Sequence, residues 1–265
     1  MNPALNIAIK AARKAGSVIL RHMDRLGGVT VTLKGRNDYV SEVDRQAEEE
    51  IIAILRKAYP AYGILAEEGG WQEGDEYQWI IDPLDGTTNY LHGFPQFAVS
   101  IALAHRGRID QAVIYDPLRE ELFTASRGSG AFLNDRRVRV SSLKTLEGSL
   151  LGTGFPFRQP AVLDVYLETF RALHPDAAGI RRAGAAALDL AYVAAGRLDG
   201  FWEFGLKPWD LAAGVLLVRE AGGLVGDFRG GEEFMKYGNL VAGNPKIFAA
   251  ILQTIAPHLP PEVRH

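Results

Sequence analysis

Acidic residues that follow apolar or aromatic segments are the groups in this sequence whose types and spacing could do chemistry. They are Glu67-Glu68 after Ile64-Leu65, Asp82 and Asp85 around Pro83-Leu84, and Asp210 after Trp209. A buried strand that ends in a carboxylate places it at a sheet edge, where ligand sites of open α/β folds gather. Converging carboxylates repel one another unless hard cations neutralise them, and oxygen ligands suit magnesium. The pattern therefore predicts a magnesium site.

The spacing from Asp82 to Thr87 carries the most information. In a turn set by Pro83, the two aspartates of this segment can face a metal pair, and the Leu84 carbonyl can point at the same cation. Gly86 and Thr87 come at an expected helix start, where backbone N–H groups suit a phosphate oxygen. The Thr87 hydroxyl can relay a proton and so orient an attacking water.

Each acidic group also has an ordinary structural interpretation when it is taken alone. Asp85-Gly86 is a common turn pair, Glu67-Glu68 can be a solvated loop, and Trp209-Asp210 can be a helix N-cap. Chance does not readily explain all three in order along one chain, so we favour the metal site.

The composition excludes several classes of chemistry and of binding partner. The chain has 265 residues, of which 47% are hydrophobic, enough for a sizeable core. Its net charge of -3 and pI near 6.1 give no general attraction to nucleic acid or to an anionic membrane. It has no cysteine, which excludes disulfides, thiolate nucleophiles and cysteine-ligated metals. Uncharged apolar runs are too short to span a membrane, so we expect a cytoplasmic protein.

Apolar periodicity predicts helices that alternate with groups of short strands. Helices are expected over Leu5–Met23, Ser41–Tyr59, Leu163–Leu173, Ala185–Ala195, Leu211–Ala221 and after Pro245, and strands over Val29–Leu33, Trp79–Ile81, Ala98–Leu103, Gln111–Tyr115, Glu121–Thr124, Val138–Val140 and near Phe201. This alternation predicts a layered α/β fold with a mixed sheet. We expect one domain over residues 1–265, with a sheet-rich half (about 1–145) and a second α/β half (about 146–265).

Two long signatures contain the aspartates, one from Trp79 to His92 and one from Trp209 to Gly223. At these residues the chain resembles the inositol monophosphatase family, part of a group of lithium-sensitive, magnesium-dependent sugar and nucleotide phosphatases. The resemblance runs over nearly the whole chain, and the segment Lys34–Asp44 also fits it. It implies an αβαβα sandwich of the inositol monophosphatase and fructose 1,6-bisphosphatase type, and a homodimer.

The resemblance implies a site for two or three magnesium ions. Glu67, Asp82 and the Leu84 carbonyl would hold one ion. Asp82, Asp85 and Asp210 would hold a second, so that Asp82 bridges the two, and Glu67 could serve a third. Since the metals supply positive charge, no arginine clamp is required.

The resemblance also implies catalytic and phosphate-binding roles. Thr87, paired with Asp44, would orient a water held by the metals for in-line attack on phosphorus, and Glu67 belongs to the same catalytic group. Asp85, Gly86 and Thr87 are expected beside the phosphate.

At the alcohol end of the substrate, the family uses a turn at a helix start and an upstream glutamate. These fall at Gly184-Ala185-Ala186 and Glu203, together with Asp210, which is already a metal ligand. Ala185 replaces the usual hydroxyl residue, which removes a side-chain hydrogen bond to the substrate. Arg181 either reaches the substrate or a partner subunit, or is a solvated surface residue.

The expected reaction is hydrolysis of a small phosphate monoester, myo-inositol 1-phosphate above all. Two alternatives within the enzyme class are fructose 1,6-bisphosphatase and 3′-phosphoadenosine 5′-phosphate phosphatase activity. A hypothesis from another class is that the chain binds the transcription or ribosome machinery, as some bacterial relatives do. The retained acidic set argues against a purely non-catalytic role, because buried carboxylates without metals are costly.

Overall fold

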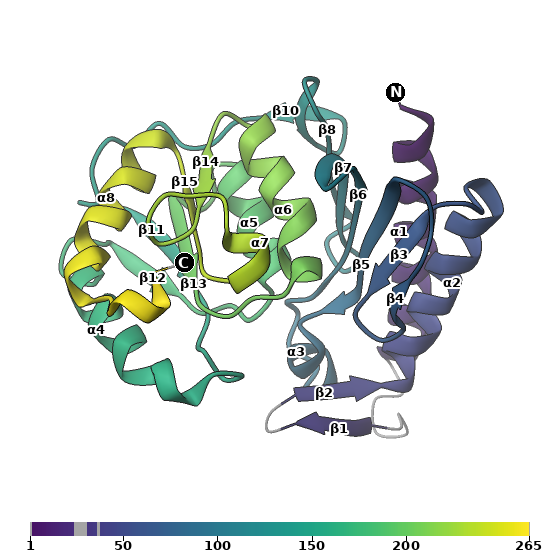
Figure 1. Cartoon of the computed structure of the whole chain (residues 1–265), viewed down its shortest axis with the longest axis horizontal. Coiled ribbons are helices and arrows are strands. Elements are labelled where there is room, and N and C mark those ends of the chain that lie inside the picture. The colour runs from purple at the N-terminus through teal and green to yellow at the C-terminus, as the bar shows by residue number, and fades with distance from the viewer. Residues whose placement is uncertain (1, 24–30, 36–37, 265) are drawn as a thin grey trace.

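The computed structural model describes residues 2–23, 31–35 and 38–264. For residues 31–35 and 38–41 it describes only the backbone. Five layers follow one another in Figure 1. They are α1 (Pro3–Met23) with α2 (Glu42–Ala58), an eight-stranded sheet, α5 (Ala186–Ala194) with α6 (Pro208–Glu220), a five-stranded sheet, and α4 (Leu163–Leu173) with α8 (Pro245–Ile255). The expected αβαβα sandwich is confirmed.

The eight-stranded sheet has the strand order β10-β9-β8-β7-β6-β5-β3-β4. Its strands are β3 (Gly63–Ala66), β4 (Gly70–Gln72), β5 (Tyr77–Asp85), β6 (Ala98–His105), β7 (Arg108–Asp116), β8 (Glu121–Ser126), β9 (Gly130–Leu133) and β10 (Arg136–Val138). Only β3 and β5 pair in parallel, so the sheet is mixed, as expected. A separate ribbon joins β1 (Val31–Gly35) to β2 (Asp38–Ser41).

The five-stranded sheet has the order β12-β11-β13-β15-β14. Its strands are β11 (Leu150–Thr153), β12 (Gly179–Arg181), β13 (Gly200–Glu203), β14 (Leu224–Gly226) and β15 (Leu240–Gly243). Strand β11 is parallel to both of its neighbours, and the other pairs are antiparallel. Two short helices, α3 (Thr87–Leu91) and α7 (Phe234–Tyr237), complete the α-helices that we describe.

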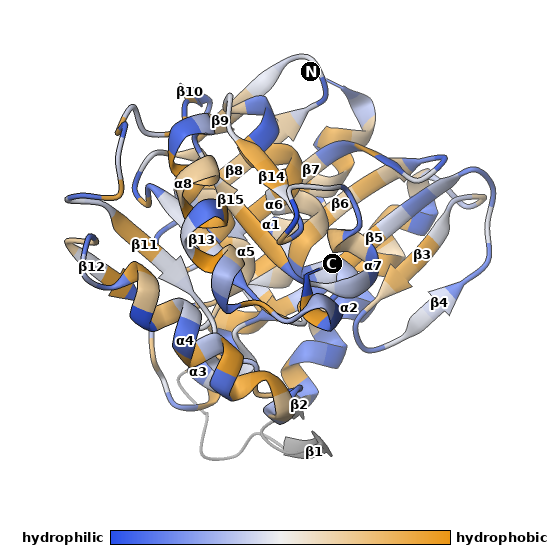
Figure 2. Cartoon of the chain, turned by 60° about the vertical axis from the view of Figure 1, so that its left-hand side comes forward, coloured by the Kyte–Doolittle hydropathy of each residue, from blue (hydrophilic) through white to orange (hydrophobic). Residues whose placement is uncertain are grey.

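The central helices α5 and α6 are apolar on almost all sides and have no polar face. They lie between the two sheets, so they are buried on nearly every side. Gly214 lets the two helices approach closely, because a Cβ there would lie 2.5 Å from the Leu190 side chain of α5. By contrast, α4 on the outer face alternates hydrophobic and hydrophilic residues (Figure 2). The central layer therefore fixes how the two sheets sit relative to each other.

Most expected elements are present, with small differences at their ends. Residues Val138–Val140 were expected as a strand, but β10 ends at Val138 because the Val140 N–H donates to the Ala221 carbonyl (3.2 Å) in the second half. The expected strand at Val29–Leu33 overlaps β1, although residues 29–30 lie outside the described residues. Among the helices of the described ranges, none is long and apolar enough to cross a membrane.

Candidate metal centre and substrate cavity

Asp82 and Asp85 lie at the end of β5, where its pairing with β6 becomes irregular. Asp82 is opposite Ser100 and Asp85 is opposite Ala98, so β5 has one extra residue in this interval. Residues three apart on a regular strand point to opposite faces, whereas one extra residue brings them to the same face. The expected turn at Pro83 is therefore wrong: the strand continues to Asp85 with a bulge, and both aspartates line one cavity.

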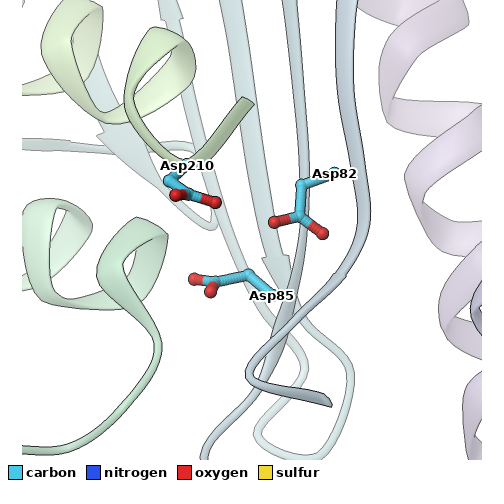
Figure 3. Close-up of side chains that lie close together, drawn as sticks. All are labelled: Asp82, Asp85 and Asp210. Atoms are coloured by element: carbon cyan, nitrogen blue, oxygen red, sulfur yellow. The ribbon is translucent and has the colours of Figure 1, made fainter. Parts of the chain in front are cut away.

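The three aspartates of the two signatures converge. Asp82, Asp85 and Asp210 each offer an oxygen, and these oxygens lie within 4.8 Å of one another. Figure 3 shows that the first two come from β5 and the third from the start of α6, with their carboxylates directed toward a common space. Glu67, in the loop after β3, and Leu84 line the same cavity. The structure thus brings together all five residues that the sequence predicts as metal ligands.

Burial makes this carboxylate cluster costly without a cation. Asp82 is 1% exposed. Its loss of solvation, followed by repulsion from Glu67, Asp85 and Asp210, raises its pKa well above the usual value. Desolvation and the charge of Asp210 raise the pKa of Asp85 in the same way. A cation bound among these oxygens would offset the cost of burying these charges and their mutual repulsion.

Helices α5 and α6 begin at the cluster and supply hydrogen bonds to it. The Lys207 N–H donates to Asp210 Oδ2 (2.8 Å), and the Ala187 N–H donates to Asp85 Oδ2 (2.8 Å). Ala185 precedes α5 and has no side-chain oxygen to cap it, so Asp85 satisfies one of the open N–H groups of that helix. The positive ends of both helix dipoles also favour negative charge here.

Thr87 is the first residue of α3 and lies beside the cluster. Gly86 before it has φ 90°, a conformation that glycine adopts without strain. The Thr87 Oγ1 lies 2.9 Å from Asp44 Oδ1 and 3.1 Å from the Leu84 carbonyl oxygen. Asp44 is buried on α2. A hydroxyl that donates a hydrogen bond to Asp44 can use its lone pairs to accept a hydrogen bond from a water and so orient it.

Helix α2 supplies a second carboxylate one turn after Asp44. Glu48 is 5% exposed and accepts a hydrogen bond from the Glu68 N–H (2.9 Å). One helix therefore positions both Thr87 and the loop that carries Glu67. Glu48 was not predicted as a site residue, because no motif marks it.

The residues expected at the alcohol end line the same cavity, which has a volume of about 660 Å³. They are Gly184, Ala185, Ala186 and Glu203. Asn89 ties the two walls together, since its Nδ2 donates to the carbonyl oxygens of Gln96 (2.8 Å) and Ala183 (2.9 Å). The candidate metal ligands and the residues expected at the alcohol end therefore line one cavity.

Glu203 and Asp189 are two further buried carboxyl groups near this end. Glu203 is 8% exposed, and Gly154 leaves room for it, because a Cβ at 154 would collide with its carboxylate. Burial, followed by the charges of Asp189 and Asp210, raises the pKa of Glu203 well above its usual value. Burial and the charge of Asp85 do the same for Asp189. Asp189 was not predicted as a site residue, because it lies in an Ala-rich helix without a motif.

Arg158 is a cationic residue of the cavity that the sequence analysis did not name. Its Nη1 lies 3.5 Å from Asp210 Oδ2, and its Nη2 lies 3.8 Å from Glu67 Oε1. It follows β11 in a segment without helical or strand periodicity, so only the folded chain reveals this contact.

Arg181 and Arg182 lie on different sides of the chain near the cavity. Arg181 is exposed at the end of β12, outside the residues that line the cavity, whereas Arg182 lines it over the Phe155 ring, 5.2 Å from the centroid. Because neighbouring residues of an extended segment point in opposite directions, the cavity receives Arg182 instead of the expected Arg181. The side chains of the Lys34–Asp38 segment lie outside the described residues.

The donor set suits a hard cation. Asp82, Asp85 and Asp210 offer carboxylate oxygens, which are ligands that magnesium and similar ions prefer. Burial, followed by repulsion among the carboxylates, raises the pKa of Asp82 and Asp85, so a cation bound beside them would stabilise their charged forms. The fold and this site define an αβαβα sandwich protein with a buried carboxylate site that could bind a metal.

Comparison with known proteins places the chain within this class. The model of the inositol monophosphatase family matches residues 1–259. The chain belongs to that family.

Similar proteins match along their full length. Nus factor SuhB of Pseudomonas aeruginosa is 61% identical over all of both chains, and Nus factor SuhB of Escherichia coli is 52% identical over 98% of each. The crystal structure of the extragenic suppressor protein suhB from Bartonella henselae has a TM-score of 0.94 at 49% identity and covers 96% of this chain and 98% of that one. An inositol monophosphatase from Anabaena (Nostoc) has a TM-score of 0.86 at 40% identity, with 97% and 96% covered.

Proposed function

We propose that this chain is a magnesium-dependent phosphatase that hydrolyses a small phosphate monoester, with myo-inositol 1-phosphate as the first candidate. One observation carries the proposal: Asp82, Asp85 and Asp210 converge in the cavity that also receives Thr87. Membership of the inositol monophosphatase family and the similar inositol monophosphatase structure support it.

In the proposed site, two or three magnesium ions are held by carboxylates and one carbonyl. The ligands would be Glu67, Asp82, Leu84, Asp85 and Asp210. Bound magnesium would supply positive charge that activates water and stabilises the departing alkoxide.

The protein's own groups place the reactants. Thr87, held by Asp44, orients a water for in-line attack on phosphorus and takes part in removing its proton. The backbone N–H groups of Gly86 and Thr87 bind a phosphate oxygen. The bond from phosphorus to the alcohol oxygen then breaks, the alcohol takes up a proton, and the products are the alcohol and inorganic phosphate.

The alcohol binds in the same cavity, next to the carboxylate cluster. Glu203 and Asp210 accept hydrogen bonds from its hydroxyl groups, and the backbone of Gly184, Ala185 and Ala186 forms the adjoining wall. The volume of about 660 Å³ suits a sugar or polyol phosphate. Fructose 1,6-bisphosphate and 3′-phosphoadenosine 5′-phosphate are the alternative substrates.

Steady-state kinetics with magnesium on inositol 1-phosphate, fructose 1,6-bisphosphate and 3′-phosphoadenosine 5′-phosphate test the proposal. We expect the highest kcat/KM for inositol 1-phosphate. A higher value for either of the others would reassign the substrate, and hydrolysis of none of the three would contradict the proposed activity.

A second candidate function is binding to the transcription or ribosome machinery. The name Nus factor, carried by relatives that match the whole chain, favours it. Nucleic acid is not an expected partner of the phosphatase, given the net charge of -3. Co-purification of Asp82→Asn and wild-type protein with that machinery would separate the two roles: equal recovery shows binding that is independent of the metal site.

We further propose that the protein is a cytoplasmic homodimer and that lithium inhibits it, as its family resemblance implies. Light scattering of the purified chain tests the dimer. Phosphate release at increasing lithium chloride, with potassium chloride as the control, tests the inhibition.

A further inference from the structure

We propose that Arg158 is a built-in counter-cation of the carboxylate cluster, which a divalent cation must displace in order to bind. The inference rests on the proposed metal site and concerns what sets the affinity of that site. It gives Arg158 a positioning role toward Glu67 and Asp210, separate from any contact with substrate.

The Arg158 guanidinium spans two predicted metal ligands from different parts of the fold. It lies between β11 and a 3₁₀ turn at Pro160–Val162. Its Nη1 is 3.5 Å from Asp210 Oδ2 on α6, and its Nη2 is 3.8 Å from Glu67 Oε1 in the loop after β3. A guanidinium fork suits such double contact, because its nitrogens diverge in one plane and its charge is permanent.

The charge of Arg158 offsets part of the repulsion within the cluster. The predicted ligands are well shielded, with side-chain exposures of 11% for Glu67 and 8% for Asp210, while Arg158 itself is 26% exposed. Opposite charges in this setting attract more strongly than fully solvated ones.

A divalent cation on the same oxygens would lie against the guanidinium and repel it. A guanidinium and a metal ion cannot both contact Glu67 Oε1 and Asp210 Oδ2, so a metal that binds through these two oxygens displaces Arg158. Arg158 is partly exposed on the cavity wall, where its guanidinium also lies over the Phe157 ring, 5.0 Å from the centroid, so solvent can receive its charge when it leaves the carboxylates. The ion pairs thus stabilise the metal-free protein and weaken its metal affinity.

Arg158→Gln tests this with metal binding as the readout. Calorimetric titration of the EDTA-treated protein with magnesium chloride should give a Kd about three- to tenfold lower than that of wild type, as expected for loss of a competing, partly exposed ion pair. In EDTA, the variant should have a lower Tm than wild type, and magnesium should raise its Tm by a larger amount.

Arg182→Gln is the matched control, because it removes an equal charge from the same cavity. Arg182 is not among the described ion-pair partners of Glu67 and Asp210. Its Kd should change by clearly less than that of Arg158→Gln. An equal change in both variants would overturn the proposal, since general charge and not displacement would then explain the effect.

An unchanged or higher Kd in folded Arg158→Gln would also overturn the inference while leaving the proposed function intact. If Arg158→Gln fails to fold, Arg158→Lys decides: it keeps the charge but loses the fork, so its Kd should fall by a smaller factor, and an unchanged Kd is the contrary result. If wild type binds neither magnesium nor manganese, the proposed function fails together with the inference.

Discussion

The two ends of the central helices α5 and α6 use carboxylates in opposite ways. At the N-terminal ends, Asp85 and Asp210 crowd together beside the cavity. At the C-terminal ends, Glu121 of the large sheet pairs with Arg197 after α5 (2.6 Å), while Glu220 of α6 accepts two backbone N–H groups from the β8–β9 turn. Both ends join the two halves of the molecule.

The pKa shifts at the two ends have opposite signs. Arg197 lowers the pKa of Glu121, whereas burial and repulsion raise those of Asp82 and Asp85. A lowered value means that the folded state stabilises the charge, and a raised value means that it penalises the charge. One end thus holds the halves together, and the other keeps an excess of negative charge that a cation can neutralise.

The largest expected effect on turnover comes from substituting Asp82, at the N-terminal ends of α5 and α6. Asp82→Asn removes the proposed bridging ligand, and a loss of several kcal/mol of transition-state stabilisation lowers kcat/KM about a thousandfold. Phosphate release from inositol 1-phosphate measures it. Glu121→Gln, at the other end, should retain turnover close to wild type. Equal turnover of Asp82→Asn and wild type would disprove the metal assignment.

Thr87→Ala should lower kcat about a hundredfold with little change in KM, because it removes the group that orients and deprotonates water. Thr87→Ser keeps the hydroxyl and should recover most of the activity. Single-turnover rates separate this chemical step from product release. Similar rates for Thr87→Ala and Thr87→Ser would show that the hydroxyl has no such role.

Glu203→Gln should weaken substrate binding but stabilise the metal-free protein. Since the folded state raises the Glu203 pKa, wild type loses stability as pH rises above about 4.3, the ordinary value. The variant avoids this loss, so in EDTA at pH 8 it should gain roughly 1 kcal/mol, or about 2–4 °C in Tm, and the gain should vanish near pH 4. KM should rise about tenfold. Thermal unfolding that shows no gain at pH 8 would contradict the buried-charge penalty.

Glu121→Gln should have the smallest effect, with a pH dependence opposite to that of Glu203→Gln. Arg197 lowers the pKa of Glu121 in the folded wild-type protein. The stabilisation from this ion pair is therefore present above the ordinary glutamate pKa and is lost as the pH falls through the folded-state pKa. At pH 7 the variant should lose about 0.5–1 kcal/mol, a modest amount because the Arg197 side chain is 40% exposed. Denaturant unfolding at pH 7 and pH 4 measures it, and a gain in stability at pH 7 would reverse the comparison.

The ligand positions were predictable because local signals mark them. Asp82, Asp85 and Asp210 each follow an apolar segment within a long signature, and the helices around them show clear periodicity. The bulge in β5 was not predictable as such, since Pro83 fits both a turn and an irregular strand.

Two residues of the site, Arg158 and Glu48, could not be predicted. Arg158 and Glu48 reach the site through tertiary packing, and no spacing in the sequence records that packing. The choice between Arg181 and Arg182 depended on one position in an extended segment, where a shift of one residue reverses the direction of the side chain.

The most direct test of the central claim is the rate of phosphate release from inositol 1-phosphate as magnesium is titrated into EDTA-treated wild-type protein. We predict no turnover without the ion and a saturable rise with it, while Asp82→Asn stays near the baseline at every concentration. A full rate without magnesium, or the same curve for Asp82→Asn, would contradict the assignment of the carboxylate cluster as a catalytic metal site.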